Sequence, residues 1–494
     1  MFEKITPEEA GISSDRVREY LATLRRHDAR MHSVLMMKGD KLFAEYYWAP
    51  FDKDFCHRMY SATKSYVGVA IGLLEEEGKL NINDPIIKYF PEKLDTPLPE
   101  WLEKQTIRDM LTMSTVGGHK NWFSSDDTDR THLYFHGRER QRPSYTLWEY
   151  DSAGSQVLSS LVEKLSGTTL LNYLNEKILK HLGTFKTAEI LKTKNGDSWG
   201  DSALLCTSRD MMSFARFVMN YGVWEGKRLM NEDYLRTATS AVVANRMSAH
   251  RSVWNYGYGY QIWQCEHGFA FVGMGSQLTI CVPEKDLIFV CTADMQGNGA
   301  ANELISGRFA DIIVENMQSE PLNPDPVSQK RLEEEARDLK LFALQGADDS
   351  PYKSRVDGVE YVCEPNPMGI SRFTLRFSED GKGGELHYTN AQGDKILPFG
   401  INHNVFGKFP QLGYSSDFGG LRTTDGFMYD DAVSAAWIDD HKFLIEVQII
   451  DRYFGNGGML FAFKDGDVMV SMTRNAEDFM NEYVGQMMGH VKGE

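Results

Sequence analysis

The sequence predicts an α+β protein with two domains. A hairpin-like pair of runs lies near the N-terminus, and a strand-rich stretch ending in a helix lies near residues 256–317, with helices between them. One antiparallel sheet built from both ends of a domain, flanked by helices and carrying an inserted helical subdomain, satisfies this order. From about residue 350 the runs become short and alternating, which predicts an antiparallel barrel or sandwich. We therefore assign residues 1–320 to the first domain, 321–348 to a linker or helix, and 349–494 to the β-rich domain.

Charge and composition exclude several classes of partner. The chain of 494 residues has a formal net charge of −17 and no long basic run, so nucleic acid and anionic membranes are not expected to bind it. The N-terminus lacks the apolar core of a signal peptide, and no stretch reaches transmembrane length. These features predict a cytoplasmic protein.

The cysteines predict neither disulfides nor a zinc site. No two of them form a Cys-x-x-Cys pair, and most lie in apolar, strand-like runs, which is typical of buried thiols. The six are Cys56, Cys206, Cys265, Cys281, Cys291 and Cys363.

The first elements are predicted from capping residues and periodicity. Thr6-Pro7-Glu8-Glu9 has the pattern of a capping box with proline at the first helical position. A helix is expected over 15–26. Strands over 33–37 and 41–48, joined through Lys38-Gly39-Asp40, predict a β-hairpin.

The next helix carries the strongest chemical signal. Residues 67–74 are apolar with small residues among large ones, which predicts a helix buried on most sides, and Gly78 is a plausible stop. Ser61 and Lys64 at its start share one face, since they are three residues apart. A serine hydroxyl needs a neighbouring base to become a nucleophile. Burial of Lys64 would lower its pKa and favour the neutral amine that can act as this base.

The middle of the domain is predicted to be helical, with one long loop. Helices are expected over 106–113, 156–165, 170–182 and 208–220, the last with Ser208 as its cap. Residues 119–148 form a long loop, which is more often a binding lid than filler. Its aromatic residues are Trp122, Phe123, Tyr134, Phe135, Tyr145 and Trp148.

The second half of the chain is predicted to be mainly strands. In the first domain these are residues 256–263, 269–275, 277–282 and 287–292, followed by a helix over 303–317; residues 328–341 form a charged helix or linker. The β-rich domain has alternating runs at 359–363, 372–377, 385–389, 432–437, 442–450, 459–464 and 467–472. A terminal helix is expected over 476–487.

Several motifs in consistent order carry a family resemblance. Ser61-Ala62-Thr63-Lys64 matches a Ser-x-x-Lys motif, and residues 106–112 resemble Thr-x-Arg-x-Leu-Leu-Thr, with Met110 in place of the first leucine. Tyr150-Asp151-Ser152 stands at a Tyr-x-Asn position, and Phe271-Val272-Gly273 at a Lys-x-Gly or His-x-Gly position. Over residues 5–318 the chain thus resembles the penicillin-recognising serine hydrolases of the class C β-lactamase type. That group includes D-alanyl-D-alanine carboxypeptidases, D-aminopeptidases, esterases and aminohexanoate-dimer hydrolases.

The resemblance implies a β-lactamase-like fold and a set of roles. Ser61 would attack a carbonyl and form an acyl-enzyme, while Lys64 and Tyr150 would move the protons. The backbone N–H groups of Ser61 and Met274 would form the oxyanion hole. It implies a small-molecule amide, peptide or ester substrate and neither a cofactor nor a metal.

Two departures from the family pattern shape the substrate prediction. Ser152 replaces an asparagine and Phe271 replaces a cation, which argues against efficient β-lactam hydrolysis and against D-Ala-D-Ala termini. The segment from Gly273 to Gln277 is more similar to the aminohexanoate-dimer hydrolase and esterase branches. We expect a neutral amide or ester, held by the aromatic loop. The substrate-binding candidates are Ser152, Phe271, Gly273, Trp122, Phe123, Tyr145 and Trp148.

Histidines offer two further hypotheses. His132 and His136 are spaced for one helix face, with His119 nearby, but the sequence gives no convincing third ligand for a metal. Solvated or loop-packing histidines are the alternative, and we predict no metal. His267 is a candidate to replace the cation missing at Phe271.

Two other functions stay open at this point. A non-catalytic binding or sensor protein on the same fold is one alternative, because two motifs are altered; a true β-lactamase is the other. The β-rich domain resembles the lipocalin-like barrel that follows the hydrolase domain in some family members. It would shape the entrance to the site or mediate homo-oligomerisation.

Overall fold

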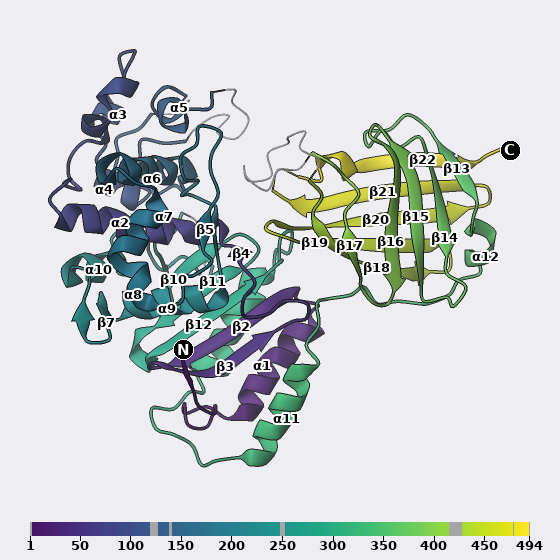
Figure 1. Ribbon diagram of the computed structural model, residues 1–494, viewed down its shortest axis with the longest axis horizontal. Coiled ribbons are helices and arrows are strands. Elements are labelled where there is room, and N and C mark those ends of the chain that lie inside the picture. The colour runs from purple at the N-terminus through teal and green to yellow at the C-terminus, as the bar shows by residue number, and fades with distance from the viewer. Residues whose placement is uncertain are drawn as a thin grey trace. The chain divides into compact units, whose positions relative to one another are not determined.

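The computed structural model describes residues 2–118, 127–137, 141–247, 252–413, 427–477 and 479–493. The chain divides into two compact units, Met1–Leu341 and Phe342–Glu494 (Figure 1). Helix α11 (Pro326–Arg337), which the sequence analysis placed in a linker, packs on α1 (Ser14–Arg26) within the first unit. Trp122, Phe123 and His119 lie outside the described residues.

The first unit is built on a seven-stranded sheet made from both of its ends. The order is β1-β3-β2-β12-β11-β10-β9, and every neighbouring pair is antiparallel except β1–β3. The pairing of β2 with β12 joins the early hairpin to the late strands, as predicted. The bounds are β1 Glu3–Lys4, β2 Met31–Lys38, β3 Lys41–Tyr47, β9 Trp263–Cys265, β10 Gly268–Gly273, β11 Gln277–Val282 and β12 Leu287–Ala293.

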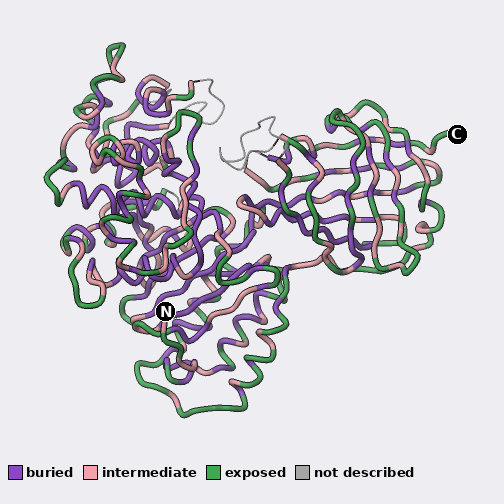
Figure 2. The backbone as a smooth tube through the Cα atoms, in the orientation of Figure 1, coloured by how far each residue is buried: buried purple, intermediate pink, exposed green. Residues whose placement is uncertain are grey.

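Helices cover both faces of this sheet, so its central strands are buried throughout (Figure 2). Alternate residues of β2 enter different cores. Leu35 and Met37 join the core with the helical subdomain, whereas Val34 and Met36 pack with α1 and with the π-helical segments η6 (Glu303–Gly307) and η7 (Ala310–Val314).

The inserted helical subdomain surrounds helix α2. All residues of α2 from Thr63 to Leu74 are buried, as the apolar run predicted. The main helices of the inserted region are α2 Thr63–Glu76, α3 Glu100–Lys104, α4 Ile107–Leu111, α5 Arg130–His136, α6 Ser152–Ser166, α7 Leu170–Leu174, η4 Asn175–Leu179, α8 Lys180–Leu182, α9 Ser208–Met219 and α10 Glu232–Ala238. Within the described part of the chain, no helix is long and apolar enough to cross a bilayer.

Four local predictions for this unit were wrong. Residues 130–136, expected to lie within a long loop, form helix α5. Thr6 and Glu9 make the reciprocal bonds of a capping box, but the segment forms turns and no helix. Thr207 caps α9, not Ser208. The strand predicted over 256–263 begins only at Trp263, because Gly257 and Gln261 have positive φ angles of 125° and 59° that break the extended backbone.

The second unit is a mixed β-barrel. Nine strands, β13–β16 and β18–β22, close into a ring through a parallel pairing of β16 with β18, and β17 pairs with β18 as well. The bounds are β13 Glu360–Cys363, β14 Arg372–Phe377, β15 Gly383–Asn390, β16 Gly393–Ile401, β17 Val405–Lys408, β18 Asp430–Asp439, β19 Lys442–Ile450, β20 Phe454–Lys464, β21 Asp467–Ala476 and β22 Gly485–Val491. The predicted barrel is confirmed, with one parallel pair that was not foreseen.

The helix predicted over 476–487 is not formed. Strand β21 extends to Ala476, a single 3-10 turn covers Asn481–Tyr483, and β22 starts at Gly485. Strand β22 bridges β21 and β13, and so satisfies backbone groups that would otherwise form open sheet edges.

Candidate active site

Ser61 lies on a strained turn just before helix α2. The preceding residue, Tyr60, has a φ of 46°, in the left-handed region that side chains rarely occupy. Its ring is buried under the guanidinium of Arg58, 4.4 Å from the ring centroid, and Arg58 Nε donates to the Ser202 carbonyl oxygen at 3.0 Å. Such a conformation costs about 1–3 kcal/mol and persists only where the surroundings enforce it. The buried Arg58 is part of that enforcement.

Lys64 reaches the hydroxyl of Ser61 as the helical spacing predicts. Its Nζ donates to Ser61 Oγ at 3.1 Å and to the carbonyl oxygen of Asp201 at 2.6 Å. The Asp201 carboxylate lies 4.0 Å away, and both side chains are 2 % exposed. Lys64 is therefore not surrounded by apolar groups alone, as the sequence suggested, but faces a buried counter-charge that the sequence analysis missed.

Tyr150 contributes its ring, rather than its hydroxyl, to the surroundings of Lys64. Lys64 Nζ lies 5.1 Å from the ring centroid of Tyr150. In this structure the side-chain partners of Lys64 Nζ are Ser61 and Asp201, and Tyr150 is 36 % exposed. A general base needs to come within about 3 Å of the proton it accepts, although catalytic contacts often shorten when substrate binds. Tyr150 thus lies at the site but is not yet in proton-transfer geometry.

A buried polar network fixes the backbone beside Tyr150. Asp151 caps helix α6 by accepting from Gly154 N at 2.9 Å, and it also accepts from Thr115 Oγ1 at 2.9 Å and from the Tyr134 hydroxyl at 3.4 Å. The Tyr134 hydroxyl in turn accepts from Gln105 Nε2 at 2.8 Å. These bonds give Tyr150 a defined position at the start of α6.

Gln261 ties three helices together behind the site. Its backbone N–H donates to Leu111 at the end of α4, and its carbonyl oxygen accepts from Ser65 of α2 at 2.7 Å. Its side-chain oxygen accepts from Ser155 of α6 at 2.6 Å. Gln261 is 1 % exposed. No sequence motif marked this residue, because it lies in the irregular segment before β9.

The end of β10 approaches the turn of Ser61 very closely. A Cβ atom added to Gly273 would lie 2.1 Å from the carbonyl oxygen of Met59. Glycine is therefore needed for this approach of two backbones. The following turn is held by Gln277 Nε2, which donates to the Met274 carbonyl oxygen at 3.2 Å. Residues Ser61 and Met274, whose N–H groups are the predicted oxyanion donors, thus belong to neighbouring backbone segments.

An aromatic wall stands beside Lys64. Tyr150 stacks on Trp263 with ring centroids 5.5 Å apart, and Trp148 lies 5.4 Å from Trp263 and 5.7 Å from Tyr258. Trp148 was a predicted binding residue, whereas Tyr258 and Trp263 were missed. Tyr145, which belongs to the same predicted loop as Trp148, is 57 % exposed. We use "aromatic wall" for Trp148, Tyr150, Tyr258 and Trp263.

Phe271 does not line a binding surface. It is 2 % exposed, and its ring lies 5.7 Å from Phe214 and 6.1 Å from Phe269 in the core between sheet and helices. Its assignment as a substrate-binding residue was wrong, because alternation along β10 places its ring in the core between the sheet and the helical subdomain. Ser152 is the first residue of α6 and is half-buried.

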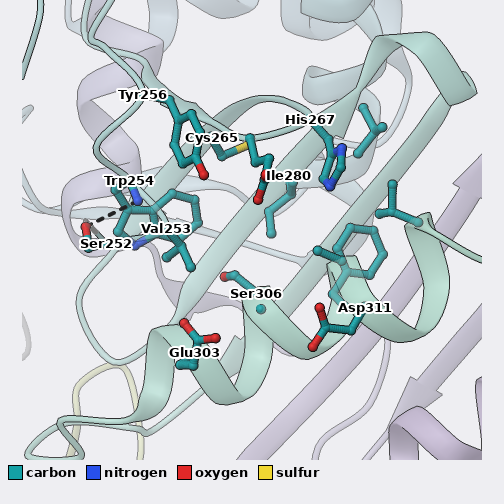
Figure 3. A pocket seen from close by; sticks show the side chains of 16 residues that line it. Ser252, Val253, Trp254, Tyr256, Cys265, His267, Ile280, Glu303, Ser306 and Asp311 are labelled. Atoms are coloured by element: carbon teal, nitrogen blue, oxygen red, sulfur yellow. Dashed lines mark hydrogen bonds between the residues drawn. The ribbon is translucent and has the colours of Figure 1, made fainter. Parts of the chain in front are cut away.

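His267 does not replace the missing cation. It lies at the opposite end of β10 from Gly273, six residues and about 20 Å along an extended strand. Its Nε2 faces Glu315 Oε1 at 3.3 Å. His267 lines a separate cavity of about 240 Å³ between the sheet and the π-helical segments, together with Ile280 and Asp311 (Figure 3). None of the catalytic candidates lines that cavity.

Comparison with known proteins identifies the family of this fold and site. The family described as Beta-lactamase matches residues 15–305, more than half of the chain. The chain therefore belongs to the β-lactamase family, within the penicillin-recognising serine hydrolases. The resemblance and the fold class predicted from the motifs are confirmed.

Individual relatives are distant. A 6-aminohexanoate-dimer hydrolase of Paenarthrobacter ureafaciens is 24% identical over 248 residues, which cover 47% of this chain and 63% of that protein. The chain thus spans less than two thirds of the length of that relative. A Bacillus anthracis structure that carries the provisional name 6-aminohexanoate-dimer hydrolase has a TM-score of 0.53 at 17% identity, covering 64% of this chain and 88% of that one. EstCE1, described as a hydrolase with promiscuous acyltransferase activity, has a TM-score of 0.50 at 13% identity, covering 62% and 99%.

Proposed function

We propose that this protein is a serine hydrolase that cleaves a small neutral amide, peptide or ester through an acyl-enzyme on Ser61. The observation that carries the proposal is the 3.1 Å hydrogen bond between Ser61 Oγ and the buried Lys64 Nζ. A hydroxyl fixed to an amine in a site of low solvent access has the partner that nucleophilic attack requires.

The reaction begins when neutral Lys64 accepts the hydroxyl proton and Ser61 Oγ attacks the substrate carbonyl carbon. The new C–O bond places negative charge on the former carbonyl oxygen, which the N–H groups of Ser61 and Met274 would stabilise. The leaving group takes a proton from Lys64 or Tyr150 as its bond to carbon breaks. Water then attacks the acyl carbon, and its proton passes through the same groups to Ser61 Oγ as the bond between Ser61 Oγ and the acyl carbon breaks, which releases the acid and restores the serine hydroxyl.

The surroundings of Ser61 favour an uncharged substrate with apolar groups. Within the aromatic wall, Trp148, Tyr150 and Trp263 are partly exposed, and Tyr150 lies next to Lys64. In the motif Phe271-Val272-Gly273, buried Phe271 stands at the position where the family has a cation, which would pair with a substrate carboxylate. The name of the Paenarthrobacter relative supports a small substrate other than a β-lactam.

A non-catalytic binding protein is the second candidate function. It is favoured by the contacts of Lys64 Nζ with buried Asp201, whose carbonyl oxygen lies 2.6 Å away and whose carboxylate lies 4.0 Å away, because such a pair gives Lys64 a structural role that needs no proton transfer. A binder would use the aromatic wall and leave Ser61 unmodified.

Steady-state turnover of p-nitrophenyl acetate and butyrate tests the proposal. We expect Ser61→Ala to lower kcat/KM about a thousandfold or more, because the nucleophile is removed. Ser240→Ala, at an exposed serine, is the matched control and should keep wild-type turnover. Nitrocefin hydrolysis should stay near the rate of Ser61→Ala. An inert wild type would favour the binding protein, and fast nitrocefin turnover would identify a β-lactamase.

A further inference from the structure

Three side chains outside the catalytic site converge in a way that suits a metal ion. His132 and His136 lie one turn apart on α5, with ring centroids 4.5 Å apart. Asp95 lies opposite them: its Oδ2 is 3.2 Å from His132 Nε2, and its Oδ1 is 3.0 Å from His136 Nε2. The three ligand atoms all lie within 4.8 Å of one another. The third ligand that the sequence could not supply is Asp95, which is 37 residues away from His132.

Both imidazole rings are oriented by a polar contact at Nδ1, the nitrogen that points away from Asp95. Asp127 Oδ2 lies 2.8 Å from His132 Nδ1, and Thr96 Oγ1 lies 3.0 Å from His136 Nδ1. Each outer nitrogen thus has an oxygen partner while each Nε2 faces Asp95. Histidines that bind metals have this arrangement, since the outer hydrogen bond fixes both the ring and its tautomer.

The backbone that carries the three residues is held independently of them. Asp129 caps α5 by accepting from the backbone N–H of His132 at 2.9 Å. The same carboxylate forms an ion pair with Lys93, close to Asp95 in the chain. The carbonyl oxygen of Lys93 lies 2.8 Å from His136 Nε2 and adds one more oxygen to the cluster.

We propose that Asp95, His132 and His136 bind one divalent transition-metal ion, and that Zn²⁺ is the ion this donor set fits best. Two imidazole nitrogens and one carboxylate oxygen are typical Zn²⁺ ligands, bound at about 2.0–2.2 Å. Two such ligands in a tetrahedral site lie about 3.3 Å apart, close to the observed 3.0 and 3.2 Å. Water or the Lys93 oxygen completes the coordination.

The ion acts as a structural link. It joins the segment at Asp95 to helix α5, and α5 carries Tyr134, which donates to Asp151 beside Tyr150. Since the three ligands converge only in the folded chain, bound metal stabilises the folded protein by an amount that grows with the logarithm of the metal concentration above Kd. The site shares no residue with the Ser61 constellation, so it stands whether or not the proposed hydrolysis is correct.

Zinc binding by the full-length, tag-free chain tests the proposal. The protein is treated with a chelator, dialysed, and titrated with ZnCl₂ by calorimetry, with bound metal counted by mass spectrometry. We expect one Zn²⁺ per chain and a rise in Tm on binding. His136→Gln and Asp95→Asn should each weaken the affinity at least about tenfold, because each removes a ligand. Co²⁺ in the same site should give visible d–d absorption bands.

The control is His490→Gln. His490 also faces two carboxylates, Asp467 at 2.7 Å and Glu364 at 3.4 Å, but it has no second histidine. This variant should bind Zn²⁺ as the wild type does. Asp95 is 63 % exposed, so Asp95→Asn reports on the site even if His136→Gln fails to fold. Absence of stoichiometric binding, or binding that survives both ligand substitutions, would overturn the proposal.

Discussion

Gly273→Ala probes the close backbone contact beside Ser61, the proposed nucleophile. The added Cβ would lie 2.1 Å from the Met59 carbonyl oxygen and 3.0 Å from Gln277 Cβ. Carbon and oxygen atoms in close contact lie about 3.3 Å apart, so the two backbones must separate by roughly 1 Å. Such a shift moves Ser61 relative to the turn at Met274, and a displacement of this size costs about a hundredfold in rate. We therefore expect kcat/KM to fall about a hundredfold, or about 2.7 kcal/mol.

The assay is ester hydrolysis by Gly273→Ala, with Tm measured on the same preparations. Gly299→Ala is the matched control, because a Cβ at Gly299 meets no atom within 4 Å. The control should keep both the activity and the Tm of the wild type. Overpacking at Gly273 should lower the free energy of unfolding by about 1–3 kcal/mol, leaving a folded protein. Wild-type kcat/KM in Gly273→Ala would refute the argument that this backbone contact sets the catalytic geometry.

Three further predictions follow from the surroundings of the site and the core. Tyr150→Phe keeps the ring and removes the hydroxyl, so kcat for ester hydrolysis should fall about a hundredfold with KM little changed if the hydroxyl transfers a proton; an unchanged kcat would leave proton transfer to Lys64 alone. Asp201→Asn should lower the free energy of unfolding by about 1–3 kcal/mol in urea titrations, because it disrupts a polar contact between two buried side chains; a value within about 0.5 kcal/mol of wild type would show that the pair is not stabilising. Burial lowers the pKa of His57 from 6.5 to about 3, so the imidazole stays neutral in the folded state but takes a proton in the unfolded chain. The contribution of neutral His57 to the free energy of unfolding is fully present above the unfolded pKa and is lost as pH falls towards the folded pKa. At pH 5 the loss is about 2 kcal/mol. Urea titrations above the unfolded pKa and at pH 5 should show this loss of stability in the wild type and a smaller loss in His57→Gln. An equal loss in both proteins would contradict the assignment to His57.

Periodicity predicted the elements whose local pattern agrees with the final fold. The run after Lys64 is apolar on every side, and α2 is buried accordingly. The early hairpin and the late strands were predicted to share a sheet, and β2 pairs with β12. Where a backbone conformation overrides the pattern, prediction failed. Gln261 has a φ of 59° and is held by bonds to three helices, so the alternation around it does not form a strand.

From residue spacing alone, the candidate site was predictable only where its residues are close in sequence, whereas Tyr150 and Met274 were predicted through the family resemblance. Ser61 and Lys64 are three residues apart, so helix geometry alone brings them together. Asp201 and Asp95 were missed because each reaches its partners through tertiary packing, 137 and 37 residues from Lys64 and His132 respectively. Phe271 was misassigned because a motif position was taken for an exposed one, whereas its strand directs the ring inward.

Labelling with a fluorophosphonate probe tests most directly whether Ser61 is an activated nucleophile. Intact mass and peptide mapping should show one adduct, on Ser61, that is absent from Ser61→Ala and from Lys64→Ala. Loss of labelling in Lys64→Ala is the decisive result, because its hydroxyl remains but its 3.1 Å partner is gone. An unlabelled wild type, or an adduct that persists in Lys64→Ala, would contradict the account that Lys64 activates Ser61.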